Sequence, residues 1–340
     1  MIAPTVPEGT LPAIEVQHLS KQFRVGTMLA ARQLHAVRDV SFAIPRGEIL
    51  ALVGESGSGK STTARLIARL LKPDSGKILL SGVDQLQREP RRPSDAYRRR
   101  IQMVFQDPFS SLNPVHSIRH HLERPLQLHH PGKHAAERVV ELLEMVGLQP
   151  GAEIADRHPH ELSGGQRQRV AFARALAVEP EIVLADEPVS MLDVSIRIDI
   201  LNLMDRLRRE QNLTCLYITH DLASARYISQ SIAVMYAGYA VEYGPPDTLL
   251  ANPAHPYSQR LIQAVPDASR TRQHDSSGVR TEPPQLVNPP PGCPFALICP
   301  AVMPRCRETM PGYTTLGGNR WVRCHLHGEG TASPEAPGGE

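Results

Sequence analysis

The chain has 340 residues, enough for one large domain with an appendage and a sizeable core. Its 37 Lys and Arg residues nearly balance 35 Asp and Glu residues, so the overall charge indicates no polyanionic partner such as a nucleic acid. The densest basic stretch, residues 88–100, is predicted to be a solvated surface, and contact with anionic lipid or a membrane subunit is the alternative.

Residues 1–13 are proline-rich and are expected to form a loose leader. They lack the basic region and apolar stretch of a signal peptide, and no apolar run approaches the roughly 20 residues that span a bilayer. The chain is therefore predicted to be cytoplasmic and to reach a membrane only through partners. In that compartment its five cysteines are expected to be free or metal-bound.

The first predicted strands, at residues 14–16 and 37–44, have a short alternating apolar pattern. Residues 49–53 are continuously apolar, as a buried parallel strand requires. This strand leads into a glycine-rich loop, and residues 62–71 follow as a helix that Pro73 stops. The order of strand, loop and helix supports the interpretation of the loop as a functional motif.

The glycine-rich loop matches the pattern G-x4-G-K-[ST]. Its glycines let successive backbone N–H groups turn onto phosphate oxygens, and the following helix points its positive end at them. Lys60 is expected to reach the β- and γ-phosphates of a nucleotide, and the Ser61 hydroxyl to bind Mg²⁺. The predicted nucleotide ligands here are Gly54, Glu55, Ser56, Gly57, Ser58, Gly59, Lys60, Ser61 and Thr62.

From about residue 92 to residue 176 the pattern is largely helical, with helices at 135–146 and 167–177. Buried strands and a helix then alternate, which predicts an α/β sheet covered on both faces. Their ranges are 182–185, 196–210, 214–219 and 232–236. The chain has no internal repeat, so it carries one such module.

Two carboxylates, Asp186 and Glu187, follow the strand at 182–185. Carboxylates at the end of a buried strand are costly unless a cation or a proton uses them. We therefore expect Asp186 to hold Mg²⁺ and Glu187 to polarise an attacking water. A pair of capping carboxylates is the alternative.

Residues 162–166 read LSGGQ, and they precede a helix. Ser163, Gly164 and Gly165 would present a hydroxyl and backbone donors at its start, which is an anion site. With this motif between the glycine-rich loop and the two carboxylates, residues 14–255 resemble the ATPase subunits of ABC transporters. The resemblance implies a P-loop NTPase fold of the ABC type, with ATP and Mg²⁺ as ligands. Its parts are a RecA-like core, an antiparallel β subdomain and a helical subdomain at about 92–176.

The resemblance also implies roles for single residues. Gln106 matches the glutamine that senses Mg²⁺ and water and faces the membrane subunit. His220 matches the switch histidine that holds the γ-phosphate and the water. Phe23 falls where the family places an aromatic ring against adenine, although packing within a strand core is the alternative. The implied catalytic residues are Lys60, Gln106, Glu187 and His220.

In this family two subunits pack head-to-tail, so each signature motif serves the ATP of the other subunit. The resemblance therefore implies that Asp193 connects the two sites. Met191 stands where the family usually has alanine, which predicts a packing change rather than a loss of activity. The implied ligands of the partner's ATP are Ser163, Gly164, Gly165 and Gln166.

The composition changes beyond residue 256. Residues 256–292 are predicted to be a proline-rich linker and residues 328–340 a disordered tail. Between them, residues 293–327 carry four cysteines with the spacing C-x5-C-x6-C-x17-C, and four thiolates can hold Zn²⁺ or an iron–sulfur cluster. These cysteines are Cys293, Cys299, Cys306 and Cys324.

The cysteine region and the HPY sequence at 255–257 resemble the ATPases of oligopeptide and dipeptide permeases. Some of these hold a [4Fe-4S] cluster, so the resemblance favours a cluster, with zinc or unligated thiols as alternatives. The residues around Glu187 and Asp193 resemble the F-type ATPase subunit, whose partner is of the D type.

The resemblance thus predicts an ATPase subunit that powers an importer of di- and oligopeptides from the cytoplasmic face of the membrane. The implied partners are a D-type ATPase subunit in a heterodimer, two integral membrane permeases and an extracytoplasmic substrate-binding protein. Import of oligosaccharides or nickel is the alternative. An ABC ATPase outside transport would need two modules or a long coiled-coil insert, and the sequence has neither.

Overall fold

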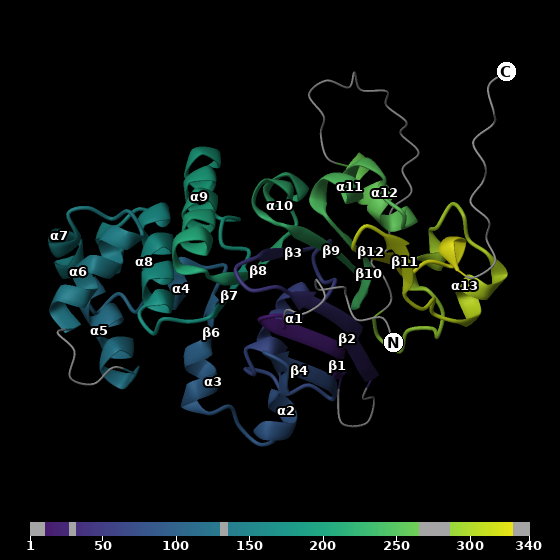
Figure 1. Cartoon of the computed structure of the whole chain (residues 1–340), viewed down its shortest axis with the longest axis horizontal. Coiled ribbons are helices and arrows are strands. Elements are labelled where there is room, and N and C mark those ends of the chain that lie inside the picture. The colour runs from purple at the N-terminus through teal and green to yellow at the C-terminus, as the bar shows by residue number, and fades with distance from the viewer. Residues whose placement is uncertain (1–10, 27–31, 130–134, 265–285, 329–340) are drawn as a thin grey trace.

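The computed structural model describes residues 11–26, 32–129, 135–264 and 286–328, which form two β-sheets and the helices around them (Figure 1). The predictions for the first ten residues of the leader, for linker residues 265–285 and for tail residues 329–340 lie outside the described residues. No helix in the described ranges is long and apolar enough to cross a membrane.

The larger sheet has eight strands in the order β11-β12-β10-β9-β3-β8-β7-β6. The run from β9 to β6 is parallel, and the strands beyond β9 are antiparallel. Every residue of the central strands β3, β7 and β8 is buried, so their continuous apolar runs are explained by cover on both faces. The parallel strands are β3 (Ile49–Val53), β6 (Ile101–Val104), β7 (Ile182–Asp186), β8 (Thr214–Thr219) and β9 (Ser231–Tyr236).

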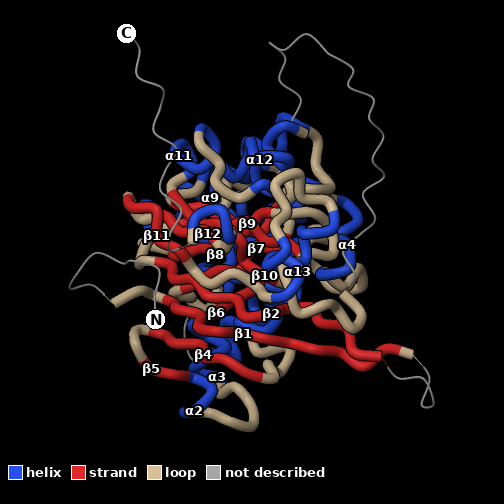
Figure 2. The backbone as a smooth tube through the Cα atoms, turned by 90° about the vertical axis from the view of Figure 1, so that its right-hand side faces the viewer, coloured by secondary structure: helices blue, strands red, loops and turns tan. Residues whose placement is uncertain are grey.

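The smaller sheet is antiparallel, in the order β2-β1-β4-β5. Its strands are β1 (Ile14–Val25), β2 (Arg32–Ile44), β4 (Ser75–Leu80) and β5 (Val83–Asp84). The strands β1 and β2 are much longer than the predicted 14–16 and 37–44, because they continue as a paired ribbon past the apolar segment. Figure 2 shows the two sheets as separate layers, with α11 and α12 beyond the larger one.

Helices lie against the larger sheet, and each follows one of its strands: β3, β7 and β8 of the parallel part, and the antiparallel β10 in the case of α11. Helix α1 ends at Ile67 rather than at the predicted residue 71, and Arg69 has a left-handed backbone with φ of 54°. These helices are α1 (Lys60–Ile67), α9 (Val194–Gln211), α10 (Leu222–Ile228) and α11 (Pro246–Ala251).

A group of helices at one end of the molecule corresponds to the predicted helical subdomain (Figure 1). Its apolar faces, which include Leu122, Val139 and Leu142, are fully buried in the same core that holds the sheet residues Val53 and Val183. The region from 92 to 176 is not helical throughout, because β6 lies within it and completes the parallel sheet. The helices of this group are α4 (Pro108–Ser111), α5 (Ile118–His129), α6 (Ala135–Met145), α7 (Gly151–Asp156) and α8 (Gly164–Leu176), with a 3-10 turn at Pro159–Glu161. Helix α3 (Asp95–Arg100) lies apart from them and leads directly into β6 (Figure 1).

The C-terminal region packs onto this fold. Residues Pro256–Gln263, the first part of the predicted linker, form helix α12. The strand β12 (Arg320–Val322) pairs with β10 (Tyr239–Gly244) and thereby extends the larger sheet. The remaining elements are β11 (Thr314–Gly317), α13 (Pro304–Glu308) and 3-10 turns at Pro294–Leu297 and His325–His327.

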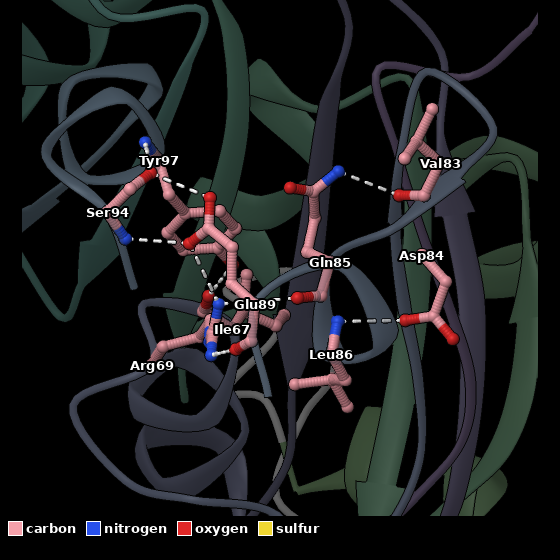
Figure 3. A network of polar contacts seen from close by, with 9 residues as sticks. All are labelled: Ile67, Arg69, Val83, Asp84, Gln85, Leu86, Glu89, Ser94 and Tyr97. Atoms are coloured by element: carbon pink, nitrogen blue, oxygen red, sulfur yellow. Dashed lines mark hydrogen bonds and ion pairs between the residues drawn. The ribbon is translucent and has the colours of Figure 1, made fainter. Parts of the chain in front are cut away.

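A polar network fastens the segment that carries α2 (Gln85–Arg88) to the end of α1 (Figure 3). The Arg69 guanidinium donates to the carbonyl oxygens of Gln85 and Glu89, and it lies 3.3 Å from the Glu89 carboxylate. That carboxylate accepts hydrogen bonds from the backbone N–H and the hydroxyl of Ser94. Tyr97 closes the network by donating its hydroxyl to the carbonyl of Ile67.

We expect Arg69→Ala to lower the free energy of unfolding by about 3 kcal/mol, because it leaves the Glu89 carboxylate unpaired in a site where both side chains are largely buried. Urea unfolding at pH 7 measures this. The matched control is Arg98→Ala, whose partner Asp95 is exposed, so its effect should be near zero. Equal effects of the two substitutions would contradict the assigned role of the network.

The difference between wild type and Arg69→Ala should also depend on pH. Burial acts to raise the pKa of Glu89, but hydrogen bonds from Ser94 and the charge of Arg69 outweigh it and hold this pKa below its ordinary value. A carboxylate with a lowered pKa stabilises the fold above its unfolded-state pKa, and this stabilisation is lost as the pH falls through the folded-state pKa. The difference should therefore shrink in acid.

Candidate active site

The glycine-rich loop connects β3 to α1 and turns too tightly for side chains at two positions. Gly59 has φ of 104°, and a Cβ there would lie 2.4 Å from the carbonyl oxygen of Ala36. Gly54 has φ of 153°, and a Cβ there would lie 2.2 Å from the carbonyl oxygen of Met235. The loop backbone therefore runs against β2 and against the end of β9, which fixes its path.

Lys60 is buried beneath this loop with only 4% of its surface exposed. Its ammonium donates to the carbonyl oxygens of Gly54 at 2.7 Å and Glu55 at 2.8 Å. Burial lowers the pKa of Lys60, and the negative charges of Glu187 and Asp186 oppose that shift. The loop thus holds a positive charge at the place where the phosphates of a nucleotide are expected.

Asp186 ends β7 beside the loop and is 3% exposed. The Ser61 hydroxyl donates to its Oδ1 at 2.7 Å. Burial raises the pKa of Asp186 above its ordinary value, and the hydrogen bond from Ser61 offsets only part of this shift. A carboxylate and a hydroxyl side by side are hard oxygen ligands, so the two residues fit the Mg²⁺ ion that the sequence predicts.

Glu187 lies at the mouth of the same site, where two polar side chains contact its carboxylate. Oε2 accepts a hydrogen bond from Gln106 Nε2 at 3.2 Å and lies 3.4 Å from His220 Nδ1. The backbone of Glu187 is left-handed with φ of 45°, which is uncommon for a non-glycine residue. Its N–H donates to the carbonyl of Ile218 at 3.0 Å, so the neighbouring strand β8 stabilises this conformation.

Most of the predicted nucleotide ligands line one cavity of about 750 Å³. Its lining is partly polar, with Lys60 and Glu187, and partly apolar, with Phe23 and Leu34, which are paired across β1 and β2. Among the other predicted ligands, Gly54, Glu55 and Ser58 lie in the loop but do not line this cavity. The predicted residues that do are Phe23, Ser56, Gly57, Gly59, Lys60, Ser61, Thr62, Gln106, Glu187 and His220.

A second cavity of about 460 Å³ shares Ser61 and Gln106 with the first and includes Asp186. Two arginines that the sequence analysis missed, Arg65 and Arg174, also line it. Arg174 donates to the carbonyl of Ser111 at 2.6 Å, and burial lowers its pKa. Its position on α8 therefore connects the helix of the signature motif to the region beyond Gln106.

The signature motif lies outside both cavities. The Ser163 hydroxyl accepts from the N–H of Gln166 at 3.2 Å, and Gln166 Oε1 accepts from the N–H of Ser163 at 2.9 Å, so the two residues cap α8. Gly165 faces α9, where a Cβ would lie 2.5 Å from Ile196. Ser163 and Asp193 are exposed, and neither lines the cavity that holds Lys60.

The four C-terminal cysteines line one narrow apolar cavity together with His255 and Phe295. Burial raises the pKa of the Cys293 and Cys324 thiols to about 11. No group of three or more His, Cys, Asp or Glu side chains in the described part of the chain is placed so that it could hold a metal ion. The predicted iron–sulfur cluster is therefore not confirmed. Cys215 is buried in β8 and does not line this cavity.

Three apolar residues of the large cavity were not predicted: Leu34, Ala36 and Leu286. No local motif marks Leu34 or Ala36, and Leu286 is distant in sequence from the loop. Tyr257 was noticed as part of the HPY sequence but not as a neighbour of the loop, although its hydroxyl accepts a hydrogen bond from the N–H of Glu55 at 3.1 Å.

Two family models match the chain. The ABC transporter family matches residues 37–190, and the oligopeptide/dipeptide transporter C-terminal region matches residues 241–306. A solved ATP-binding cassette dimer, in a post-hydrolysis state with ADP and Pi, has a TM-score of 0.59 and 31% identity, and the match covers 68% of this chain and 98% of that chain.

Curated relatives match over nearly their whole length. The oligopeptide transport ATP-binding protein AppF of Bacillus subtilis is 43% identical over 322 residues, which are 92% of this chain and 97% of the relative. The dipeptide transport ATP-binding protein DppF of Haemophilus influenzae is 40% identical over 323 residues, 94% of this chain and 98% of the relative. The resemblance predicted from the motifs is thereby confirmed: the chain belongs to the ABC transporter ATP-binding family and is an ABC-type ATPase.

Proposed function

We propose that this protein is the ATP-hydrolysing subunit of an ABC importer for di- and oligopeptides, peripheral to the cytoplasmic face of the membrane. The observation that carries the proposal is the Glu187 carboxylate, held between Gln106 and His220 at the mouth of a cavity that also contains Lys60. The names of the relatives, which are oligopeptide and dipeptide transport ATP-binding proteins, support peptides as the cargo.

In the proposed reaction, water attacks the γ-phosphate of ATP and releases ADP and phosphate. Lys60 and the loop N–H groups bind the phosphates and stabilise the charge that develops on them. Mg²⁺, when held by Ser61 and Asp186 with Gln106 nearby, would neutralise charge on the phosphate oxygens. Glu187 orients the water and accepts its proton, while His220 and Gln106 position the carboxylate through their contacts with Oε2.

We expect Glu187→Gln to lower ATP turnover by about 100-fold or more, because the amide cannot accept the proton of the water. Binding of ATP should be retained, since Lys60 and the loop are untouched. A steady-state phosphate-release assay and titration with a fluorescent ATP analogue measure the two quantities. The matched control is Glu210→Gln, an exposed carboxylate at the end of α9. Normal hydrolysis by Glu187→Gln would refute the assignment of the base.

We further propose that the chain pairs with a different, D-type ATPase subunit and works with two membrane permeases and a substrate-binding protein. The signature residue Ser163 is exposed and does not line the cavity of its own chain, which supports a role on the ATP of a partner. Met191 and Val194 beside it are exposed apolar side chains, as expected of a surface that a second subunit covers.

A double-mutant cycle in the purified transporter tests this pairing. Ser163→Ala should lower hydrolysis at the partner's site by about tenfold, because one hydrogen bond to a charged phosphate is lost. Its effect should be non-additive with a substitution of the partner's catalytic base and additive with Glu187→Gln. Coupling of Ser163→Ala to Glu187→Gln would instead indicate that two copies of this chain pair with each other.

We also propose that Cys293, Cys299, Cys306 and Cys324 bind a [4Fe-4S] cluster. The support is that all four thiols line one apolar cavity, and a bound cation would reverse the cost of ionising them there. The cluster would then crosslink three separate stretches of the C-terminal region: the one with Cys293 and Cys299, the one with Cys306, and the one with Cys324.

Anaerobically purified protein should contain about four irons per chain and absorb visible light, and Cys306→Ala should lose both properties. The matched control is Cys215→Ala, which removes a buried thiol of the sheet and should leave the iron in place. One zinc per chain without iron would overturn the cluster in favour of a zinc site.

A further inference from the structure

The C-terminal region reaches the nucleotide site at two points that are far apart in the sequence, one on the phosphate loop and one in the lining of the large cavity. One is Tyr257 at the start of α12, and the other is Leu286 in the segment that precedes the cysteines. Both lie within the match to the oligopeptide/dipeptide transporter C-terminal region and outside the match to the ABC transporter family.

Tyr257 contacts the first peptide group of the phosphate loop. Its hydroxyl accepts a hydrogen bond from the N–H of Glu55 at 3.1 Å. The carbonyl of that same peptide group belongs to Gly54 and accepts from Lys60 Nζ at 2.7 Å. One peptide group is thus held from its two sides by Tyr257 and Lys60, so a rotation of the group would break both hydrogen bonds.

The position of the Tyr257 hydroxyl is itself well defined. The residue is 1% exposed, and its ring packs on Tyr236 and Phe295 with centroid separations of 4.4 Å and 5.7 Å. The backbone N–H of Tyr257 donates to Nδ1 of His255. The backbone N–H of His255 in turn donates to the buried Glu242 carboxylate at 2.9 Å. Burial raises the pKa of the Tyr257 phenol, which therefore stays neutral.

Leu286 is held beside β2 by the backbone. The N–H of His35 donates to the carbonyl of Leu286 at 2.9 Å, and the N–H of Asn288 donates to the carbonyl of Gln33 at 3.0 Å. Leu286 lines the large cavity together with Phe23 and Leu34, which are paired across β1 and β2, so the three residues form an apolar patch of its lining. Lys60 and the phosphate loop take the phosphates of the nucleotide, so the apolar patch is the part of the lining that suits its base.

We propose that the C-terminal region completes the nucleotide site: Tyr257 is a positioning residue for the phosphate loop, and Leu286 packs against the base. The inference rests on the ATPase function proposed above and adds a role for the C-terminal region. It predicts different signatures for the two residues, because one acts on the phosphates and the other on the base.

Displacement of a fluorescent ADP analogue from the full chain, by ADP and by pyrophosphate, separates these signatures. Tyr257→Phe should weaken both ligands by the same factor, about threefold to tenfold, since it removes one hydrogen bond of the loop and keeps the ring. The matched control is Tyr243→Phe, a buried tyrosine of β10 whose hydroxyl donates to Ser231. This control loses a comparable hydrogen bond and should bind both ligands as wild type does.

Leu286→Ala should weaken the binding of ADP by about fivefold and leave that of pyrophosphate unchanged, because only ADP places a base against the apolar patch. Leu297→Ala is the matched control, since Leu297 is an exposed leucine of the same region. Equal affinities of wild type and Tyr257→Phe would overturn the positioning role. Equal effects of Leu286→Ala on the two ligands, or none, would overturn the contact with the base.

Two further measurements keep these outcomes interpretable. Thermal unfolding of each variant, compared with its matched control, separates a change at the site from a loss of fold. Wild-type protein that bound neither ADP nor pyrophosphate would refute the proposed function itself. Wild-type binding combined with unchanged variants would refute only the inference.

Discussion

The site depends on one constraint: the fold buries a positive charge, the ammonium of Lys60, near the end of β3. Burial disfavours the ammonium of Lys60, and the carbonyls of Gly54 and Glu55 together with the carboxylates nearby offset that cost. The carbonyls point inward only because glycines allow the loop backbone its path. The same turn brings Ser56, Gly57 and the start of α1 into the lining of the cavity, where phosphate oxygens would complete the balance of charge.

The parallel sheet brings the remaining groups to this charge. Strands β3, β7 and β8 are adjacent and run in the same direction, so their carboxyl ends lie at one edge. Asp186 and Glu187 lie at that edge where β7 ends, and His220 lies where β8 ends. Gln106 follows the neighbouring strand β6. Of these four residues, only Asp186 and Glu187 are close to each other in the sequence. Their meeting is a consequence of strand order rather than of any local motif.

The sequence predicted those parts of the site whose signal is local. A pattern of a few consecutive residues is enough to predict the glycine-rich loop, the two carboxylates after an apolar run, and the buried strands. Leu286 and Tyr257 could not be found in this way, because each contact depends on where a distant segment packs. Similarly, the full length of β1 and β2 is set by their mutual pairing, which alternation of apolar residues over a short range does not reveal.

The cysteine cavity and the nucleotide cavity are parts of one packed structure. Phe295 lines the cysteine cavity and also contacts the ring of Tyr257, whose hydroxyl bonds the phosphate loop. Cores packed at high density transmit a change of volume to their neighbours. The ring of Phe295 therefore connects the packing around the four thiols to the tyrosine that bonds the N–H of Glu55. The C-terminal region thus forms part of the ATP site.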